Sequence, residues 1–199
     1  MKIAVFSMDI EDWYHLDYFR SIIKNKEYSL LDGVNNYLEL IESYQIPSSF
    51  FVLEEIANSQ KKLIQDLSNK KYDIGSHGDD HTRPMEIKLS DFRKSISKTK
   101  NNLEDIIGRE VIGYRAPCFS LDRDRLEVIK DNGFKYDSSK IDFSIHPLYG
   151  DLDLADFKKI EKNIYEKDSF FEFENSTTMI LNKNIPISGG GYLRILPWK

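Results

Sequence analysis

Cysteine is almost absent from this sequence: Cys118 is the single one among 199 residues. One thiol cannot form an internal disulfide, so a disulfide-stapled secreted fold is excluded, and a reducing compartment is favoured. Long apolar runs are missing as well. The first one, residues 3–6, has four residues before the acidic Asp9, which is too short for a signal-peptide core or a membrane span. We therefore expect a soluble, cytoplasmic protein without a membrane span.

The chain also lacks the basic excess of a nucleic-acid-binding protein. It has 28 Lys and Arg against 33 Asp and Glu, a formal net charge of −5, so we expect no nucleic-acid partner. Hydrophobic residues make up 40% and aromatic residues 13% of the chain, which is enough for a sizeable core. The length fits one domain over residues 1–199. The composition does not define the oligomeric state.

Apolar runs typical of buried strands alternate with segments of helical periodicity over most of the chain. Strands are expected at 2–8, 48–53, 72–74, 111–115, 134–137 and 170–173. Helices are expected at 32–44, 54–70, 90–107 and 122–132. Proline or glycine interrupts several of these segments. Alternation of strand and helix is typical of an α/β fold with parallel strands. The pattern loosens after Asp137, and Gly189 to Gly191 indicate a loop.

Polar residues stand at the carboxyl ends of several expected strands. In chain order they are Asp9, Glu11, Asp12, His77, His81, Arg115 and Asp137. In folds built on parallel strands these ends share one face, where active sites collect. We therefore expect residues that are far apart in the sequence to meet in one pocket.

Two histidines four positions apart, His77 and His81, are candidate metal ligands. One helical turn brings residues at this spacing onto one face, and imidazole is a common ligand of zinc and related metals. The pair alone is weak evidence, because the spacing is common by chance. Asp9, Glu11 and Asp12 add three carboxylates that repel one another, and a bound cation is the usual compensation. The alternative for them is a helix cap or a solvated loop.

Arg115 stands between Tyr114 and Ala116 in a mostly apolar stretch. An unpaired guanidinium would be costly there, so a bidentate pair with a carboxylate such as Asp9 is expected. A surface position is the alternative.

Four further residues are individually weak candidates. His15 and His146 are interpreted as structural when taken alone. Asp137, followed by two serines, is explained as well by a turn or cap as by a site. Cys118 is interpreted as a small buried apolar side chain with no sign of a nucleophile.

Together the motifs resemble those of the polysaccharide deacetylases of the NodB-homology family, in the branch with an Asp-x-Glu-Asp first motif. The matching segments are 7–14, 76–81, 113–117, 136–150 and 186–194. The resemblance implies an α/β fold, an irregular (β/α) barrel of the NodB-homology type. It also implies hydrolysis of an N-acetyl group on an amino sugar of a cell-surface or extracellular polysaccharide or its precursor. The substrate partner would be an N-acetylated glycan.

The resemblance also implies roles for individual residues. The metal ligands would be His77, His81 and either Glu11 or Asp12. The divalent metal would be zinc first, with cobalt, nickel or manganese as alternatives. Asp9 would be the general base, held and kept ionised by Arg115. Substrate contacts would come from Tyr114, Pro117, Cys118 and Asp137, with a backbone N–H near Tyr114 or Cys118 facing the oxyanion.

The sequence departs from the family at the general acid. The family's last motif supplies a histidine, whereas no histidine follows His146. Regular eight-fold barrels have about 250 residues, so we expect a chain that lacks the C-terminal part of the barrel, with His146 as the alternative acid. Two other functions stay open. One is hydrolysis of cyclic amides or ureides on the same fold, and the other is a non-catalytic carbohydrate-binding module. Asp9 and Arg115 argue against the module, because sugar binding needs neither.

Overall fold

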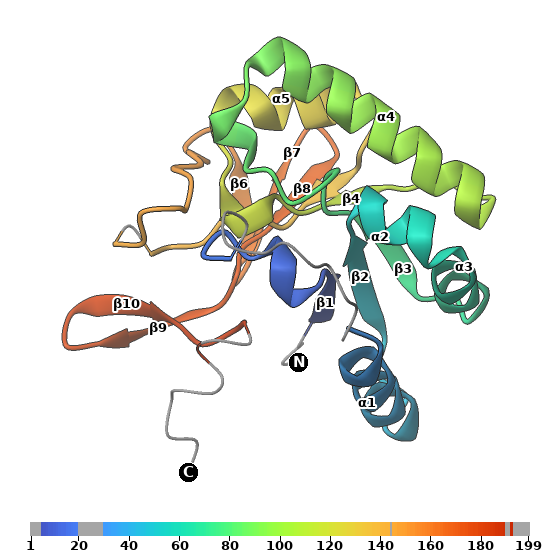
Figure 1. Cartoon of the computed structure of the whole chain (residues 1–199). Coiled ribbons are helices and arrows are strands. Elements are labelled where there is room, and N and C mark those ends of the chain that lie inside the picture. Colours follow the sequence, from blue (N-terminus) through green and yellow to red (C-terminus); the bar gives the residue numbers. More distant parts are fainter. Residues whose placement is uncertain (1–4, 20–29, 144, 190–191, 193–199) are drawn as a thin grey trace. The chain divides into compact units, whose positions relative to one another are not determined.

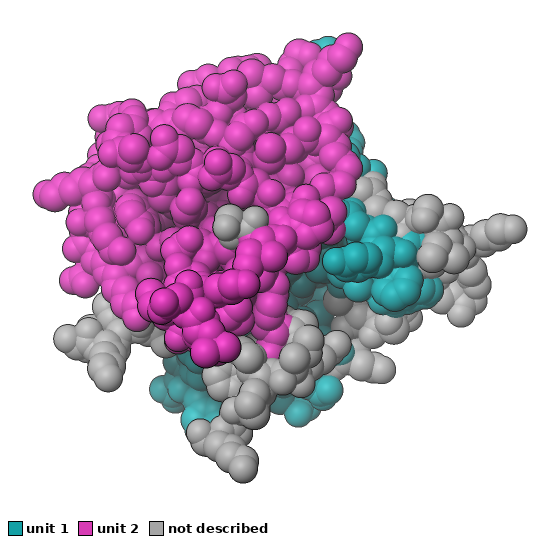
Figure 2. Space-filling model, turned by 90° about the vertical axis from the view of Figure 1, so that its left-hand side faces the viewer, with its two compact units in different colours: residues 1–82, 94–113 teal, residues 83–93, 114–199 magenta. Residues whose placement is uncertain are grey.

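The computed structural model describes residues 5–19, 30–143, 145–189 and 192 (Figure 1). The chain divides into two compact units, residues 1–82 with 94–113 and residues 83–93 with 114–199 (Figure 2). The carboxylates and histidines of the first two motifs belong to the first unit. Arg115 and Asp137 belong to the second.

Three parallel strands form the sheet of the first unit: β1 (Phe6–Ile10), β2 (Ser48–Val52) and β3 (Asp73–Ser76). Phe51 of β2 pairs with Asp9 on one side and with Gly75 on the other. The apolar end of β2 is fully buried, as expected for a central parallel strand covered on both faces. A Cβ on Gly75 would lie 2.7 Å from Cδ1 of Phe51, so this close approach requires glycine.

The helices of the first unit are α1 (Leu30–Ser43), α2 (Glu54–Ser59), α3 (Lys61–Asn69) and most of α4 (Leu89–Ile107). The continuous helix expected over 54–70 is wrong. The backbone leaves helical geometry at Gln60, with φ −121° and ψ 39°, and separates α2 from α3. Both pieces still bury aliphatic side chains, among them Ile56 and Ile64. The expected stop of α4 at Gly108 is confirmed, with φ +69°.

The second unit contains a mixed sheet. Its β5 (Tyr136–Asp137) pairs in parallel with β8 (Phe170–Phe173), and β8 continues antiparallel to β7 (Ile164–Lys167) and then β6 (Lys158–Glu161). The short β4 (Gly113–Tyr114) contributes the carbonyl of Tyr114, which accepts the N–H of Ser138 at 3.0 Å. The strand expected at 170–173 is confirmed. The strands β6 and β7 were not predicted, because their exposed or half-buried residues show no apolar pattern.

The remaining elements of the second unit are α5 (Arg123–Asp131) and a hairpin of β9 (Thr177–Ile180) and β10 (Lys183–Pro186). Asp122 caps α5 by accepting the N–H of Arg125, and Gly133 follows its end with φ +82°. The expected helix at 122–132 is therefore confirmed. The hairpin was not predicted.

Parts of two expectations lie outside the described residues. They are residues 2–4 of the first strand, and residues 190, 191, 193 and 194 of the glycine-rich segment.

None of the helices in the described ranges is long and apolar enough to cross a membrane.

Candidate metal centre

The loop that carries both candidate histidines is tied by its backbone to β2 and α2. His77, directly after β3, donates its N–H to the carbonyl of Val52 at 2.9 Å. The carbonyls of Gly78 and Asp79 accept the first two N–H groups of α2, at 2.9 and 3.1 Å. Those N–H groups have no partner within the helix. The same contacts therefore satisfy the start of α2 and hold the histidine loop.

The two imidazoles meet on this loop rather than on the helical turn that their spacing suggested. Their ring centroids are 5.3 Å apart, and His77 and His81 are 2% and 3% exposed. His81 has φ +66° and Gly78 has φ +88°. A left-handed backbone is uncommon for a residue other than glycine and persists where the surroundings hold it. The loop therefore presents both rings at the cost of local backbone strain.

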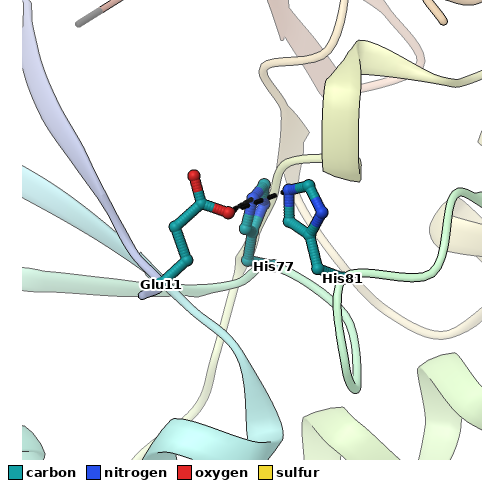
Figure 3. A group of neighbouring side chains, drawn as sticks. All are labelled: Glu11, His77 and His81. Carbon is teal, nitrogen blue, oxygen red and sulfur yellow. Dashed lines mark ion pairs between the residues drawn. The ribbon is translucent and has the colours of Figure 1, made fainter. Parts of the chain in front are cut away.

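Glu11 follows β1 and extends its carboxylate toward the two rings (Figure 3). Its Oε2 lies 2.8 Å from Nε2 of His81 and 3.9 Å from Nε2 of His77. One candidate ligand atom from each residue lies within 4.8 Å of the others.

One carboxylate oxygen of Glu11, Oε2, lacks a hydrogen bond at this cluster. Oε2 is buried, and its 2.8 Å contact with Nε2 of His81 is an ion pair without hydrogen-bond geometry, so it has no hydrogen-bond partner among the residues that the structure describes. A buried polar atom without such a partner is costly. A cation between Glu11, His77 and His81 would satisfy it, and two imidazoles with one carboxylate form a donor set that suits zinc and its neighbours. The residues present therefore fit a divalent metal.

The neighbouring carboxylates differ in their surroundings. Asp9 has its Oδ2 4.0 Å from Nε2 of His77, and its side chain is 26% exposed, close to the 24% of Glu11. Asp12 is 4% exposed and accepts the N–H of Trp13 on Oδ1 at 2.7 Å. It caps the short 3-10 helix η1 (Trp13–His15). The cap interpretation thus describes Asp12, whereas Glu11 is the acidic residue beside the histidines.

His15 completes that cap. Its Nδ1 accepts the N–H of Asp12 at 2.9 Å, which leaves Nε2 to carry the proton of the neutral ring. Burial lowers the pKa of His15, against the charge of Glu55, whose Oε2 lies 3.6 Å from Nε2. These contacts agree with the structural interpretation of His15, because they fix the turn between Glu11 and η1.

In the second unit, the buried Arg115 has partners of its own. Nε donates to the carbonyl of Ser138 at 3.2 Å and Nη2 donates to its hydroxyl at 2.9 Å. The alternative of a surface position is excluded by this burial. The pair with Asp9 joins residues of different units and stays a prediction.

Asp137 is 0% exposed, and its carboxylate accepts the N–H and the hydroxyl of Ser139, both at 2.8 Å. Burial raises the pKa of Asp137 to about 6, opposed by hydrogen bonds from Glu172 and Ser139. Its role as a substrate contact stays a prediction.

Glu172 was missed by sequence reasoning. It is 0% exposed and lies opposite Asp137 in the β5–β8 register. A signal was present: Phe170 and Glu172 alternate with half-buried residues along β8, which places a glutamate on the buried face of an apolar strand.

The other predicted contacts lie around a short 3-10 helix, η3 (Pro117–Phe119). Tyr114 is buried, and this burial raises the pKa of its hydroxyl well above the usual value. Pro117 is buried too. The expectation of a buried Cys118 is wrong, because this residue is half-buried with φ +52°. Their contacts with substrate stay predictions.

His146 stacks on Tyr149 with ring centroids 4.1 Å apart. Its Nδ1 accepts the N–H of Leu148 at 3.3 Å, and partial burial lowers its pKa. Both features stabilise the neutral ring.

Residues 28–136, more than half of the 199, match the family model of polysaccharide deacetylases. The chain belongs to the polysaccharide deacetylase family. The predicted NodB-homology family is thereby confirmed, and members of this family generally use a divalent metal.

Two kinds of relatives agree with this assignment. The peptidoglycan deacetylase of Helicobacter pylori is 27% identical over 142 residues, which cover 68% of this chain and 46% of that protein. The chain thus spans less than half the length of this relative. A solved Mycobacterium smegmatis protein assigned to the polysaccharide deacetylases superposes with a TM-score of 0.62 at 18% identity, over 94% of this chain and 64% of that one. Together with the parallel strands of β1–β3 and β5–β8, this likeness confirms the α/β fold of the NodB type.

A third likeness bears on whether the fold implies catalysis. A pseudoenzyme of the CE4 family from Bacillus anthracis superposes with a TM-score of 0.53 at 12% identity, over 65% of this chain and 40% of that one. Fold alone therefore does not establish turnover, and activity has to be argued from the site.

Proposed function

We propose that this chain is a metal-dependent deacetylase that hydrolyses the N-acetyl group of an amino sugar in a polysaccharide or its precursor. The single observation that carries this proposal is the cluster of Glu11, His77 and His81, with its buried carboxylate oxygen that lacks a hydrogen-bond partner. These three residues would hold the metal, zinc first and cobalt, nickel or manganese as alternatives.

The division of labour follows from the surroundings of each residue. When bound, a divalent metal supplies Lewis acidity to the amide carbonyl and to water. Asp9 is the proposed base, because its carboxylate lies beside His77 but, unlike that of Glu11, is not part of the cluster of candidate ligand atoms. It would take the proton of the attacking water on Oδ2. Asp12 and His15 would hold the first motif in place through their cap.

The proton for the leaving amine needs a separate donor. His146 is a weak candidate on physical grounds, because burial lowers its pKa and its Nδ1 already accepts a hydrogen bond. A general acid works best when its pKa lies near the working pH. These contacts argue against His146 as the acid.

The proposed function is tested by two measurements on the same preparation of the 199-residue chain. Metal content is measured by mass spectrometry after dialysis, and acetate release is measured with N-acetylated chito-oligosaccharides. We expect about one divalent metal per chain and only slow metal-dependent acetate release, because no residue has been assigned as the proton donor for the leaving amine. Metal-dependent opening of a cyclic ureide such as allantoin, without acetate release, would support the cyclic amide alternative. Glycan binding without hydrolysis of either substrate would support the non-catalytic module.

A further inference from the structure

Two buried carboxyl groups lie side by side in the second unit, one of them on the matching segment 136–150. Asp137 of β5 and Glu172 of β8 are directly opposite in parallel register, and both are 0% exposed. Two ionised carboxylates at such a position would repel each other without water to screen them. Carboxyl pairs of this kind commonly keep one proton between them.

The hydrogen bonds around the pair show which residue carries that proton. Both oxygens of Asp137 accept hydrogen bonds, from the hydroxyl and the N–H of Ser139 at 2.8 Å each, which favours its ionised form. Oε1 of Glu172 accepts the N–H groups of Ser139 at 3.1 Å and Lys140 at 2.8 Å. Oε2 of Glu172 is buried and lacks a conventional partner within the described part of the chain.

We propose that Glu172 is protonated at neutral pH and donates the hydrogen on Oε2 to the carboxylate of Asp137, which makes Glu172 a positioning residue for the turn at 138–140. The turn is then held from β8 by one neutral acid through its two oxygens. The directions of the pKa shifts agree with a proton on Glu172. Burial and the neighbouring charge of Asp137 raise the pKa of Glu172 well above its usual value, whereas the hydrogen bond from Glu172 lowers the pKa of Asp137.

This turn supports the guanidinium of Arg115. Ser138 accepts two hydrogen bonds from Arg115, and the hydroxyl of Ser139 accepts the N–H of Ala116 at 2.8 Å. Ser138 is also held by its N–H, which donates to the carbonyl of Tyr114, and by its hydroxyl, which donates to the carbonyl of Phe173. Loss of the bond between the two acids would therefore loosen one of several supports of Arg115. That Arg115 serves hydrolysis depends on the proposed function, whereas the proton on Glu172 does not.

Other titratable groups face the pair from the neighbouring elements. The charge of Arg115, next to β4, lowers the pKa of Asp137, and the charge of Asp137 raises the pKa of Tyr114. Tyr165 of β7 is registered opposite Glu172, but its hydroxyl donates to Glu174 at 3.0 Å. The side chain of Lys140 donates to the carbonyl of Leu152 at 2.8 Å. Arg115 is thus the cation that acts on this pair among these neighbours.

Infrared spectroscopy tests the position of the proton directly. At pH 7 the intact chain should show the C=O stretch of a protonated carboxylic acid, and Glu172→Gln should remove this band. The exposed Glu161 supplies a matched control, so Glu161→Gln should leave the band unchanged. Absence of the band from the wild-type chain, or its persistence in Glu172→Gln, would overturn the proposal.

The pH dependence of stability gives a second test. The folded pKa of Glu172 is raised above its unfolded value of about 4.3. Its stabilising contribution is therefore complete below that value and is lost as the pH rises toward the folded pKa. In Glu172→Gln the amide donates permanently. Over this range the unfolding constant of the wild type, relative to that of the variant, should rise by up to about tenfold per pH unit. If the stability of the wild type relative to Glu172→Gln does not fall between pH 5 and pH 8 in urea, the assignment is wrong.

Steady-state kinetics test whether Glu172 helps to position Arg115. Glu172→Ala should lower kcat for acetate release by about 10- to 100-fold through misplacement, and Glu172→Gln should restore most of it. An unchanged kcat in Glu172→Ala would remove the positioning role. If the wild type releases no acetate, the proposed function fails, while the infrared band still decides the proton on Glu172.

Discussion

Carboxyl groups have different surroundings in the two units of this protein. In the first unit, Oε2 of Glu11 faces two imidazoles, forms an ion pair with His81 and makes no hydrogen bond within the described residues. In the second unit, backbone and hydroxyl groups donate to Asp137 and Glu172, and one proton completes the pair. A buried carboxylate oxygen without a hydrogen bond can bind a cation. Carboxyl groups that make all their hydrogen bonds instead hold the surrounding backbone in place.

The backbone shows the same contrast. The histidine loop of the first unit includes His81 in a left-handed conformation and is held through its carbonyls by the start of α2. The turn at 138–140 in the second unit is held by one side chain of β8, that of Glu172. The loop that carries the candidate histidine ligands therefore has a strained backbone. In the second unit, buried acids hold the backbone of the turn through hydrogen bonds. The following predictions test this difference, beginning with the largest effect.

Removal of either imidazole should have the largest effect. His77→Ala and His81→Ala should lose stoichiometric metal and all metal-dependent acetate release. At a hundredfold excess over Kd, metal should stabilise the wild type by about 2.7 kcal/mol and neither variant. Mass spectrometry and thermal unfolding with and without zinc measure these effects, with His146→Ala as the histidine control. Full metal retention in both variants would place the metal elsewhere.

Asp9→Asn should separate proton transfer from metal binding. The variant should keep its metal, because Asp9 lies 4.0 Å from His77 and outside the closest cluster. Acetate release should fall by about 10²- to 10⁴-fold, which is the usual contribution of a positioned base. Unchanged turnover would exclude Asp9 as the base whatever the metal content.

The two other acidic residues of the first motif should respond differently. Glu11→Gln should lower metal affinity at least about tenfold, the lower bound expected even for an outer-shell partner. Asp12→Asn should keep the metal and lose at most about 1 kcal/mol of stability, because asparagine also caps helices. Metal titration and urea denaturation of both variants decide the third ligand. The reverse pattern would transfer that role to Asp12.

Ser139→Ala tests the hydrogen bonds around the buried pair of Asp137 and Glu172 in the second unit. The change removes the hydroxyl bond to Asp137 and leaves the N–H of Ala116 without its acceptor. We expect a loss of about 1–3 kcal/mol of unfolding free energy, measured by urea denaturation at pH 7. The exposed Ser176 is the control, and Ser176→Ala should change stability by less than about 0.5 kcal/mol. Equal losses of unfolding free energy in Ser139→Ala and Ser176→Ala would show that the buried hydrogen bonds of Ser139 add no measurable stability.

His146→Gln should have the smallest effect. Because the contacts of His146 favour a neutral ring, turnover in this variant should stay within about threefold of wild type, well short of the 10²-fold contribution of a general acid. The pH–rate profile is measured in parallel. A hundredfold loss of turnover with metal retained would restore His146 as the proton donor.

Local pattern was sufficient for the elements with strong periodicity. The apolar run of β2, the capped helix α5 and the glycine stop of α4 all follow from residues close in the sequence. The strands β6 and β7 did not, because exposed antiparallel strands carry few apolar residues and are recognised through their partners. The break at Gln60 was missed for a related reason: helical periodicity continues across it.

By itself the sequence determined the family, the α/β class and the candidate ligands, because motif chemistry and strand–helix alternation are local properties. Tertiary structure decided which carboxylate faces the histidines and which one caps a helix, since Glu11 and Asp12 are adjacent in the chain but diverge after β1. It also decided that Glu172 meets Asp137. That contact depends on the register between β5 and β8, which brings together two residues 35 positions apart, and register is set by packing across the sheet rather than by either strand alone.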